Sequence, residues 1–335
     1  MIQQISPPWQ TVDWQNALKS VITTPDELIG LLNLPESMHP EITSASERFG
    51  LRIPKTLLNR IVKGNPDDPV LKQFLPTGEE LKTVDGYVDA PLQEGNYNPA
   101  PGLLHKYAGR VLLITTSTCA VNCRYCFRRN FPYQENTPGK AGLTPALNYI
   151  RNNASIEEVI LSGGDPLNLS DSHLDWLLTT LATIPHIKTI RFHTRTAVVI
   201  PQRITADFLN LLDTQRFQFV FVVHANHAQE INDEVHLAMQ CLRQKALLLN
   251  QSVLLNGIND TAATQIALCR RLIAVGIIPY YLHLLDKVSG AHHFDVTAVE
   301  SADALMTTLQ HSLPGYAVPR MVREIPGTLG KQVVV

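Results

Sequence analysis

The sequence predicts an α/β fold, a partial (β/α)6 barrel that follows an N-terminal helical region. Beyond residue 100, short β-branched runs alternate with helix-length stretches. From the second run onward they recur about every 30 residues, which is the length of a strand, a crossover helix and two loops. Because six such runs are visible, we do not expect a closed eight-stranded barrel.

The first hundred residues differ from the rest. TTPDELIGLLNL at 23–34 predicts a helix with a Thr N-cap and an acidic first turn, and IPKTLLNRIVKG at 53–64 predicts a second helix that ends at Gly64. Segments 64–80 and 88–107 are rich in Pro, Gly, Asp and Asn, so we expect ordered loops that wrap over a surface. We therefore predict a helical region with its linker at 1–100 and the barrel at 101–335.

The barrel elements follow from the alternation of patterns. The expected strands are 110–116, 157–162, 188–194, 217–223, 246–255 and 277–285. The expected helices between them are 171–184, 204–214, 234–246 and 261–276.

Polar residues gather where the predicted strands end. They are 162–165, 193–195, 224–227, Asn250 and Gln251, and Asp286. In parallel α/β folds the loops that leave this edge converge on one site. Loops are also polar simply because they are solvated. The alignment of so many positions nevertheless favours one shared site.

Composition excludes several classes of protein. Twenty-eight basic and thirty acidic residues leave a formal charge of −2, which argues against wholesale binding of nucleic acid or anionic membrane. The first residues show no basic and apolar signal pattern, and no apolar run approaches the ~20 residues of a membrane span. We expect a soluble, cytoplasmic protein without a membrane partner.

The strongest local signal is a C-x3-C-x2-C arrangement, Cys119, Cys123 and Cys126, directly after the first strand. Three thiolates on one loop can ligate three irons of a cubane cluster and leave the fourth iron open. Structural zinc would want a fourth ligand, and three inert buried thiols are the other alternative. Cys241 and Cys269 lie in apolar helical stretches and are expected to pack in the core.

The cysteine loop, the aromatic Tyr125 within it, and SGGDPL at 162–167 resemble the radical S-adenosylmethionine (SAM) superfamily. The resemblance implies a [4Fe-4S] cluster held by the three cysteines. It also implies that Tyr125 and the run Gly163, Gly164 and Asp165 line SAM. Glycine suits a place where the backbone must approach a ligand closely.

A closer resemblance covers most of the chain. GNPDDPVLKQFLP, PGLLHKYAGRVLL, CRYCFRR, HANH, NQSVLLNGIND and PYYLHLLDKVSGAHHF are similar to the lysine 2,3-aminomutase family. That family ends its barrel in PGGGGK, whose lysine forms a Schiff base to pyridoxal 5'-phosphate (PLP), and PGTLGK at 326–331 corresponds to it. The resemblance makes Lys331 the catalytic lysine. Thr328 and Leu329 replace two family glycines, and Glu324 replaces a family Asp.

Within the family, the chain resembles the short members that convert (S)-α-lysine to (R)-β-lysine for modification of elongation factor P. This implies an isomerase that acts on free lysine, draws electrons from a flavodoxin-like donor, and supplies a separate elongation factor P lysine ligase. A catabolic lysine 2,3-aminomutase and a radical SAM enzyme that does not use PLP remain alternatives. So does a non-catalytic Fe–S or zinc protein that binds the translation machinery.

Further roles follow from the resemblance. Arg195, His224 and Gln251 are expected next to SAM or PLP, and hydrogen bonds that merely anchor loops are the alternative. Arg110 corresponds to an arginine on the PLP phosphate, and Lys106 stands where the family has a second one. A lysine binds phosphate as a point charge rather than as a bidentate fork.

The substrate needs a cation for its carboxylate and anions for its distal ammonium. Arg128 corresponds to the arginine on the lysine carboxylate, and Asp286 and Glu324 to the two acids on the ε-ammonium. Arg124, Arg128 and Arg129 alternatively form a solvated basic patch or an RNA contact. Direct nucleic-acid binding is not expected.

Overall fold

The computed structural model describes residues 5–137, 139–296, 299–328 and 330–334. These residues form one nine-stranded sheet whose spatial order follows the chain order. Strands β2 to β8 are parallel, while β1 and β9 pair antiparallel at the two edges. The strands are β1 (Leu103–Tyr107), β2 (Arg110–Thr116), β3 (Glu158–Gly163), β4 (Thr189–Thr194), β5 (Gln218–Val223), β6 (Leu247–Val253), β7 (Ile278–His283), β8 (Arg320–Arg323) and β9 (Gln332–Val333).

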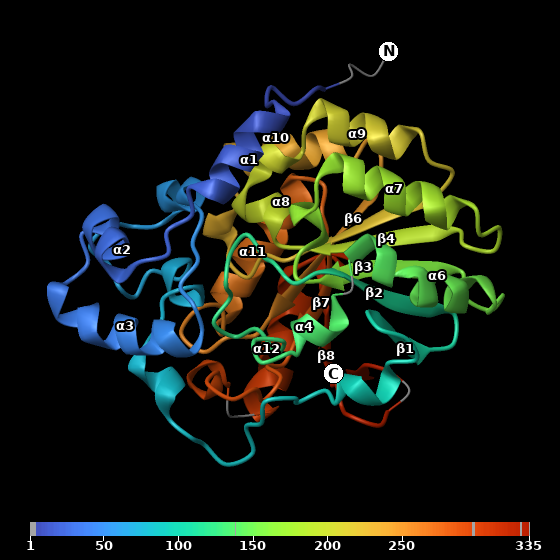
Figure 1. Ribbon diagram of the computed structural model, residues 1–335. Coiled ribbons are helices and arrows are strands. Elements are labelled where there is room, and N and C mark those ends of the chain that lie inside the picture. The colour runs from blue at the N-terminus through green and yellow to red at the C-terminus, as the bar shows by residue number, and fades with distance from the viewer. Residues whose placement is uncertain (1–4, 138, 297–298, 329, 335) are drawn as a thin grey trace.

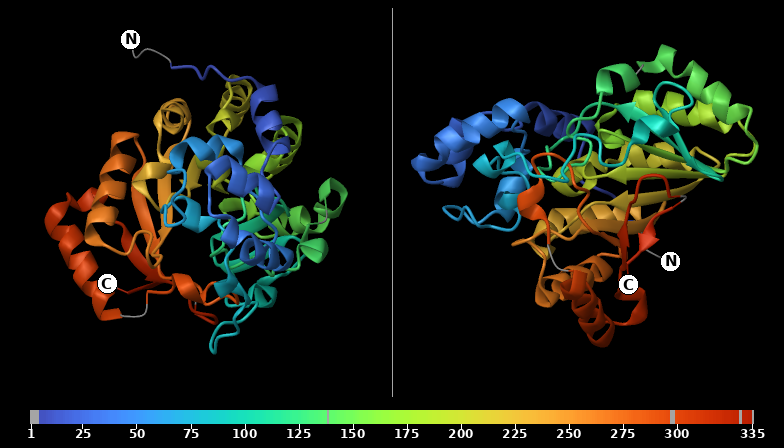
Figure 2. Two further views of the ribbon diagram at one scale, coloured as in Figure 1. Left: turned by 90° about the vertical axis from the view of Figure 1, so that its left-hand side faces the viewer. Right: turned by 90° about the horizontal axis from the view of Figure 1, so that it is seen from below.

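Helices cover the outer side of this curved sheet (Figures 1 and 2). One crossover helix follows each strand from β2 to β7: α6 (Thr144–Arg151), α7 (Asp171–Ala182), α9 (Ala206–Asp213), α10 (Asp233–Leu242), α11 (Ala262–Ala274) and α12 (Val299–Ser312). Three single-turn helices, α4 (Tyr133–Asn136), α5 (Gly139–Gly142) and α8 (Thr196–Val199), lie in the loops. Since the sheet order runs from β1 to β9 without closing, the predicted partial (β/α)6 barrel is confirmed.

Local sequence explains where the crossover helices begin. In α7 the Ser170 side chain accepts a hydrogen bond from the His173 N–H, which satisfies a donor that the helix leaves free. Thr205, Asn232 and Thr261 do the same for α9, α10 and α11. Each helix then buries an apolar stripe against the sheet.

The structure adds elements to the prediction. The six expected strands are present within a few residues, but β1, β8 and β9 were not predicted. Strand β8 has only four residues, with exposed Arg320 and Arg323 at its ends, so it carries little of the apolar signal of a buried strand. Helices α6 and α12 were missed as well.

The N-terminal region contains α1 (Thr11–Lys19), α2 (Pro25–Leu32) and α3 (His39–Arg48). The Thr24 cap and acidic first turn of α2 are confirmed. The second predicted helix, at 53–64, is wrong: the chain forms a 3-10 helix at Lys55–Arg60, and β-branched Ile61 is already extended. Gly64, at φ 76°, instead donates its N–H to the Leu32 carbonyl at the end of α2.

Two apolar cores hold these layers together. The larger lies between the sheet and the crossover helices, where the Phe192 and Phe221 rings stack with centroids 4.6 Å apart. The second joins α1 to α3 with Val121 and Val199, which belong to loops that leave β2 and β4. The helical region therefore packs on the carboxyl edge of the sheet (Figure 1). The domain boundary near residue 100 stays a prediction, and no described helix is long and apolar enough to cross a membrane.

Candidate active site

A cavity of about 760 Å³ lies inside the barrel. It extends from loops at the carboxyl edge of the sheet to residues near the strand starts, such as Arg110 and Arg191. Its volume is in the upper part of the range for small-molecule sites. The predicted site residues all line it: Lys106, Arg110, Cys119, Cys123, Tyr125, Cys126, Arg128, Gly163, Gly164, Asp165, Arg195, His224, Gln251, Asp286, Glu324 and Lys331.

The cysteine loop follows β2 and is fastened to the N-terminal region. The Nε of Arg52 donates to the Cys119 carbonyl at 2.7 Å, and the Arg124 N–H donates to the Gln73 carbonyl at 2.9 Å. Burial raises the pKa of the thiols, that of Cys126 to about 11. Because thiolates are the ligands in metal and cluster sites, a bound cation is needed to stabilise them here.

Three cysteines on one loop fit a cluster better than a single ion. Among the residues that the structure describes, no three His, Cys, Asp or Glu side chains form a group that could hold a metal ion. A structural zinc site uses four ligands that converge on one point, and this loop offers three cysteines. In a cubane cluster each thiolate ligates a different iron, so convergence is not required.

The glycine run after β3 has a structural cause that differs from the expected one. A Cβ on Gly164 would lie 2.3 Å from the Thr118 carbonyl oxygen, and a Cβ on Gly163 would lie 2.8 Å from that of Thr116. Gly163 also has φ 108°, a conformation that favours glycine. The close approach is therefore to the backbone of the cysteine loop, which these glycines hold beside β3.

Asp165 shares that structural role. Its buried carboxylate accepts hydrogen bonds from the Thr194 hydroxyl at 2.8 Å and from the backbone N–H groups of Arg195, Thr196 and Leu167 at 2.6, 2.7 and 3.0 Å. A carboxylate offers about four lone-pair sites, so little capacity is left for a ligand. Asp165 fixes the loop after β4 against the loop after β3.

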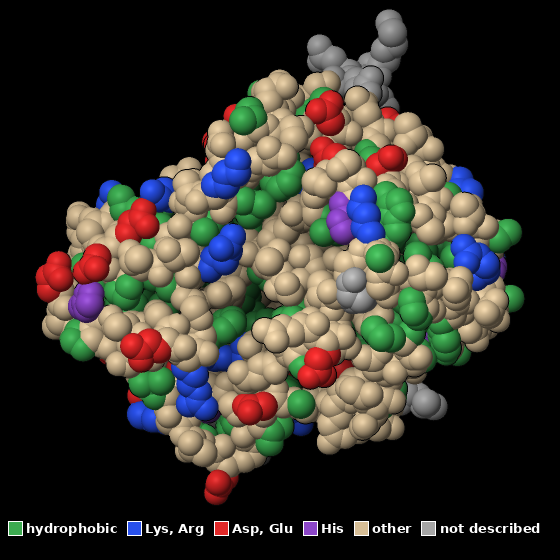
Figure 3. Space-filling model, in the orientation of Figure 1, with side chains coloured by type: hydrophobic (Ala, Val, Ile, Leu, Met, Phe, Trp, Pro, Cys, Tyr) green, Lys and Arg blue, Asp and Glu red, His purple; other side chains and the backbone are tan. Residues whose placement is uncertain are grey.

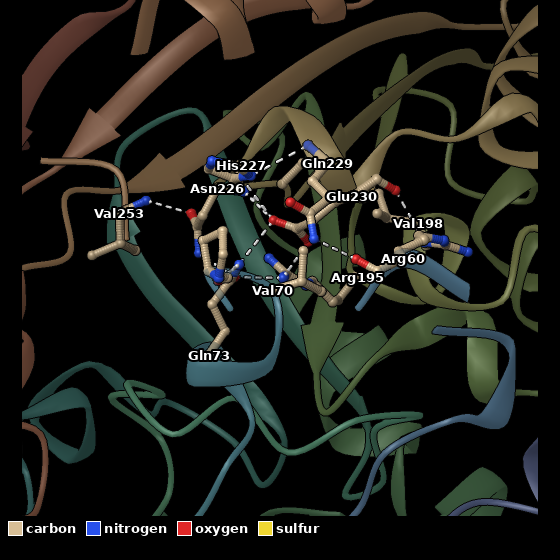
Figure 4. Close-up of polar contacts among 12 residues, drawn as sticks. Arg60, Val70, Gln73, Arg195, Val198, Asn226, His227, Gln229, Glu230 and Val253 are labelled. Carbon is tan, nitrogen blue, oxygen red and sulfur yellow. Dashed lines mark hydrogen bonds and ion pairs between the residues drawn. The ribbon is translucent and has the colours of Figure 1, made fainter. Parts of the chain in front are cut away.

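Arg195 belongs to a buried network around Glu230 (Figure 4). Its Nη2 lies 2.5 Å from Glu230 Oε2 and 2.8 Å from Gln73 Oε1, and its Nη1 lies 3.1 Å from the Tyr125 hydroxyl. The other Glu230 oxygen accepts the N–H of Asn226 at 2.7 Å. These contacts of Arg195 are hydrogen bonds that anchor loops, as in the alternative given above. The Nε of Arg195, however, is buried without a partner among the described residues.

Three histidines of the cavity wall carry buried Nε2 atoms that have no hydrogen-bond partner in the described part of the chain: His193, His224 and His283. Burial lowers the pKa of all three, and together with nearby Arg195 and Lys331 it lowers that of His224 to about 3. Neutral imidazoles with free nitrogens in a cavity wall fit a polar ligand. His283 was not predicted, because a single histidine inside an apolar strand carries no motif.

Elsewhere in the cavity wall, Glu324 lies between two lysines. Its Oε1 is 2.7 Å from Lys106 Nζ, and its Oε2 is 2.7 Å from Lys331 Nζ. Burial alone would raise the pKa of Glu324, but the two ammonium groups outweigh it and lower the pKa to about 2. Lys106 therefore forms an ion pair with Glu324. Of the two residues that replace family glycines, Leu329 lies outside the described residues.

Asp286 behaves differently from Glu324. Its carboxylate makes no hydrogen bond to the described residues, and burial raises its pKa to about 7, although Lys331 opposes that rise. The site thus contains an acid that gains from a cationic ligand.

Arg128 is already paired in this structure. Its Nε and Nη2 donate to the two oxygens of Glu94 at 2.8 and 2.7 Å, and its Nη1 donates to the Ser162 hydroxyl at 3.2 Å. Glu94 lies in the wrapping linker and was not predicted. A lone Glu in a Pro- and Asn-rich loop gives no sequence signal for such a contact.

The neighbouring arginines do not form a solvated patch. Arg124 is fully buried and donates to both Glu80 oxygens at 2.8 and 2.6 Å, while Arg129 Nη2 lies 2.7 Å from Glu80 Oε2. The basic-patch alternative is therefore wrong for Arg124 and Arg129. Arg110 lies with its guanidinium 4.0 Å from the centre of the Tyr107 ring, at the deep part of the cavity. Its role at the PLP phosphate stays a prediction.

The space-filling view shows a face of the molecule that is hollowed near its centre (Figure 3).

No family model matches the chain. A protein from Haemophilus influenzae named L-lysine 2,3-aminomutase is 47% identical over 95% of this chain and 94% of its own length. One of the same name from Escherichia coli is 46% identical over 95% and 93%.

A glutamate 2,3-aminomutase from Clostridioides difficile is 34% identical over 96% of this chain and 76% of its own length. Among solved structures, a radical SAM methyltransferase from Sphaerobacter thermophilus matches 68% of this chain and 69% of its own, with a TM-score of 0.46 and 18% identity.

Proposed function

The chain belongs to the L-lysine 2,3-aminomutase family, a family of isomerases, and we propose that its cavity converts (S)-α-lysine to (R)-β-lysine. One observation carries the proposal. The three-cysteine loop, Lys331, a cation for a carboxylate and two acids for an ammonium all line a single cavity. A site that used only one of these groups would have no need of the others, so their presence together points to one reaction.

The chemistry explains why such a site is needed. The amino group moves from Cα to Cβ, and the hydrogen on Cβ has no neighbour that makes it acidic, so a general base cannot remove it at neutral pH. When bound, a [4Fe-4S] cluster with SAM supplies a carbon radical that takes this hydrogen, and PLP carries the migrating nitrogen. Cys119, Cys123 and Cys126 would hold the cluster, and Lys331 would hold PLP with Arg110 at its phosphate.

The chain's own residues orient the substrate. Arg128 offers a planar fork for the α-carboxylate. Lys331 would lose its ammonium charge on holding PLP, so Glu324 would have one cationic partner fewer and, with Asp286, could receive the ε-ammonium of an entering lysine. Glu324 is one methylene longer than the family Asp, which shifts this anion along the cavity.

The acids also favour lysine over glutamate. A glutamate side chain would bring a third carboxylate towards Asp286, whose pKa is already raised by burial and by its acidic neighbours Glu324 and Glu94. Like charges in a poorly solvated wall oppose binding, whereas an ammonium relieves both acids. This supports the lysine substrate for this chain.

The test is an anaerobic assay after cluster reconstitution. Protein, (S)-α-lysine, SAM and a reductant are incubated with and without PLP, and α- and β-lysine are separated on a chiral column. PLP-dependent β-lysine that is lost in Cys126→Ala and in Lys331→Ala supports the proposal, with a loss on the order of 10³-fold or more. SAM cleavage without β-lysine under either condition would favour a radical SAM enzyme that does not use PLP.

We further infer that the product serves the modification of elongation factor P through a separate ligase, with a flavodoxin-like protein as the reductant. The resemblance of CAVNCRYCFRRNFPYQEN, LLHKY and HANHAQE to the family members with that role supports it over lysine catabolism. Deletion of the gene should lower the mass of intact elongation factor P, and Lys331→Ala should fail to restore it. If β-lysine added to the deletion strain restores the mass, the ligase is intact and the missing step is the supply of β-lysine.

A further inference from the structure

The linker over the cavity, residues 81–101, has no buried side chain. Its flanking residues Glu80 and Gly102 are buried. We call this segment, residues 81–101, the strap; in Figure 1 it is the cyan segment along the lower edge of the molecule. Segments with few buried apolar contacts open at low free-energy cost.

The strap is held near Val88 by backbone contacts and by the Tyr87 hydroxyl, which donates to Asp295 at 2.6 Å, and farther along by an ion pair. The Val88 N–H donates to the Lys287 carbonyl at 3.0 Å, and the Ser289 N–H donates to the Val88 carbonyl at 3.0 Å. Farther along, Glu94 forms the two-pronged pair with Arg128 in the cavity wall. The side chains of both residues are largely shielded from solvent, with exposed fractions of 17% and 7%.

The Glu94 pair occupies the fork that an amino acid carboxylate would use. Nε and Nη2 of Arg128 each bind one Glu94 oxygen, and Nη1 is held by Ser162. A second carboxylate cannot bind the Nε–Nη2 edge while Glu94 is there, since each N–H donates along one direction. At the N–H groups that remain it would lie beside the negative charge of Glu94. Glu94 and a substrate carboxylate therefore compete.

We propose that Glu94 is a specificity-determining latch, which holds the Arg128 fork until substrate binds and is displaced by the α-carboxylate of the substrate. The proposal deepens the proposed function, because it depends on Arg128 as the carboxylate site. Displacement frees the strap, so its opening is coupled to a ligand that carries a carboxylate. A diamine that lacks the carboxylate cannot displace Glu94, even though it can reach Asp286 and Glu324.

The first test measures binding rather than turnover. Lysine and 1,5-diaminopentane are titrated by calorimetry into enzyme loaded with cluster and PLP, without SAM. Glu94→Gln should bind lysine about tenfold more tightly than the wild type, as expected when a charge-assisted competitor is weakened. Its affinity for the diamine should change by less than about twofold. The control is Asp89→Asn, the same carboxylate-to-amide change at an exposed strap position that contacts Asn130; it should leave both affinities unchanged.

Weaker lysine binding by Glu94→Gln would show that Glu94 positions Arg128 and would overturn the latch. Equal tightening of both ligands would also overturn it, because the diamine has no carboxylate with which Glu94 could compete. If neither protein binds lysine, the proposed substrate fails, and the latch is tested without ligand. Amide hydrogen exchange in residues 86–98 should then be about tenfold faster in Glu94→Gln than in the wild type; unchanged exchange would contradict the latch.

Discussion

Two groups of buried charges lie around the same cavity, and they differ in how completely they are paired. Glu230, behind the cysteine loop, is fully buried and accepts hydrogen bonds from Arg195, Gln73 and two backbone N–H groups. Asp286, in the opposite group, makes no hydrogen bond to the described residues, and Glu324 is held by two lysine ammonium groups and the hydroxyl of Tyr107.

The difference separates scaffold from binding site. A buried carboxylate that is saturated by fixed protein donors has no capacity for a ligand, and removing it leaves other charges unpaired. A carboxylate with flexible or missing partners can exchange them for a ligand. The Glu230 cluster therefore fixes Arg195 and Tyr125, and we expect the Glu324 cluster to be the part that rearranges when small molecules bind.

The largest expected effect is on the saturated cluster. Glu230→Gln would place an amide N–H₂ against donors and leave the Arg195 guanidinium buried without its counter-ion. We expect a loss of about 3 to 5 kcal/mol in the free energy of unfolding, measured by urea denaturation at pH 7. Glu79→Gln, at an exposed ion pair with Lys82, is the matched control and should cost less than about 1 kcal/mol. Similar losses in the two variants would break the comparison.

Replacing Asp286 is expected to raise the free energy of unfolding instead of lowering it. Its folded pKa of about 7 lies above its ordinary value of 3.8, so its ionisation destabilises the fold as the pH rises between these two values. Asp286→Asn should be more stable than the wild type at pH 8, on the order of 2 kcal/mol. Below pH 4 the gain should vanish. Thermal unfolding across this pH range measures it, and a variant less stable than the wild type at pH 8 would show that Asp286 has a cationic partner in the free protein.

Glu324→Gln should have a smaller effect. The folded pKa of about 2 lies below the ordinary value of 4.5, so the ionised group stabilises the fold above pH 4.5, and this stabilisation is lost as the pH falls from 4.5 towards 2. At pH 7 we expect a loss of about 1 kcal/mol, since Lys331 stays partly solvated. The difference between variant and wild type in urea denaturation should shrink below pH 4.5. A difference that grows towards acid would contradict the assignment.

The smallest effect on stability is expected for His224→Leu. The Nε2 of His224 is buried without a partner in the described chain, so replacing the ring by an apolar side chain removes an unsatisfied group. The free energy of unfolding should change by less than about 1 kcal/mol, whereas SAM binding should weaken if His224 contacts that ligand. Unchanged SAM affinity, measured by equilibrium dialysis, would remove His224 from the ligand contacts.

The sequence predicted the barrel better than it predicted the partners of the site residues. Periodicity located the six strands from β2 to β7, and strand ends placed Arg195, His224 and Asp286 on one wall. It could not show that Glu94 binds Arg128 or that Glu324 bridges Lys106 and Lys331, because those pairs join segments far apart in the chain. The glycines Gly163 and Gly164 illustrate the same limit: the sequence could not show their close approach to the Thr116–Thr118 backbone, and their contact with SAM stays a prediction.

The most direct test of the account is to follow the migrating nitrogen. Reconstituted enzyme with SAM, PLP and a reductant is given lysine labelled with ¹⁵N at the α-amino group, and the product is examined by ¹³C and ¹⁵N NMR. We predict that the label is found on Cβ, with both oxygens of the carboxyl group and the ε-nitrogen unchanged. Formation of 5'-deoxyadenosine while all of the ¹⁵N remains on Cα would contradict an aminomutase site in this cavity.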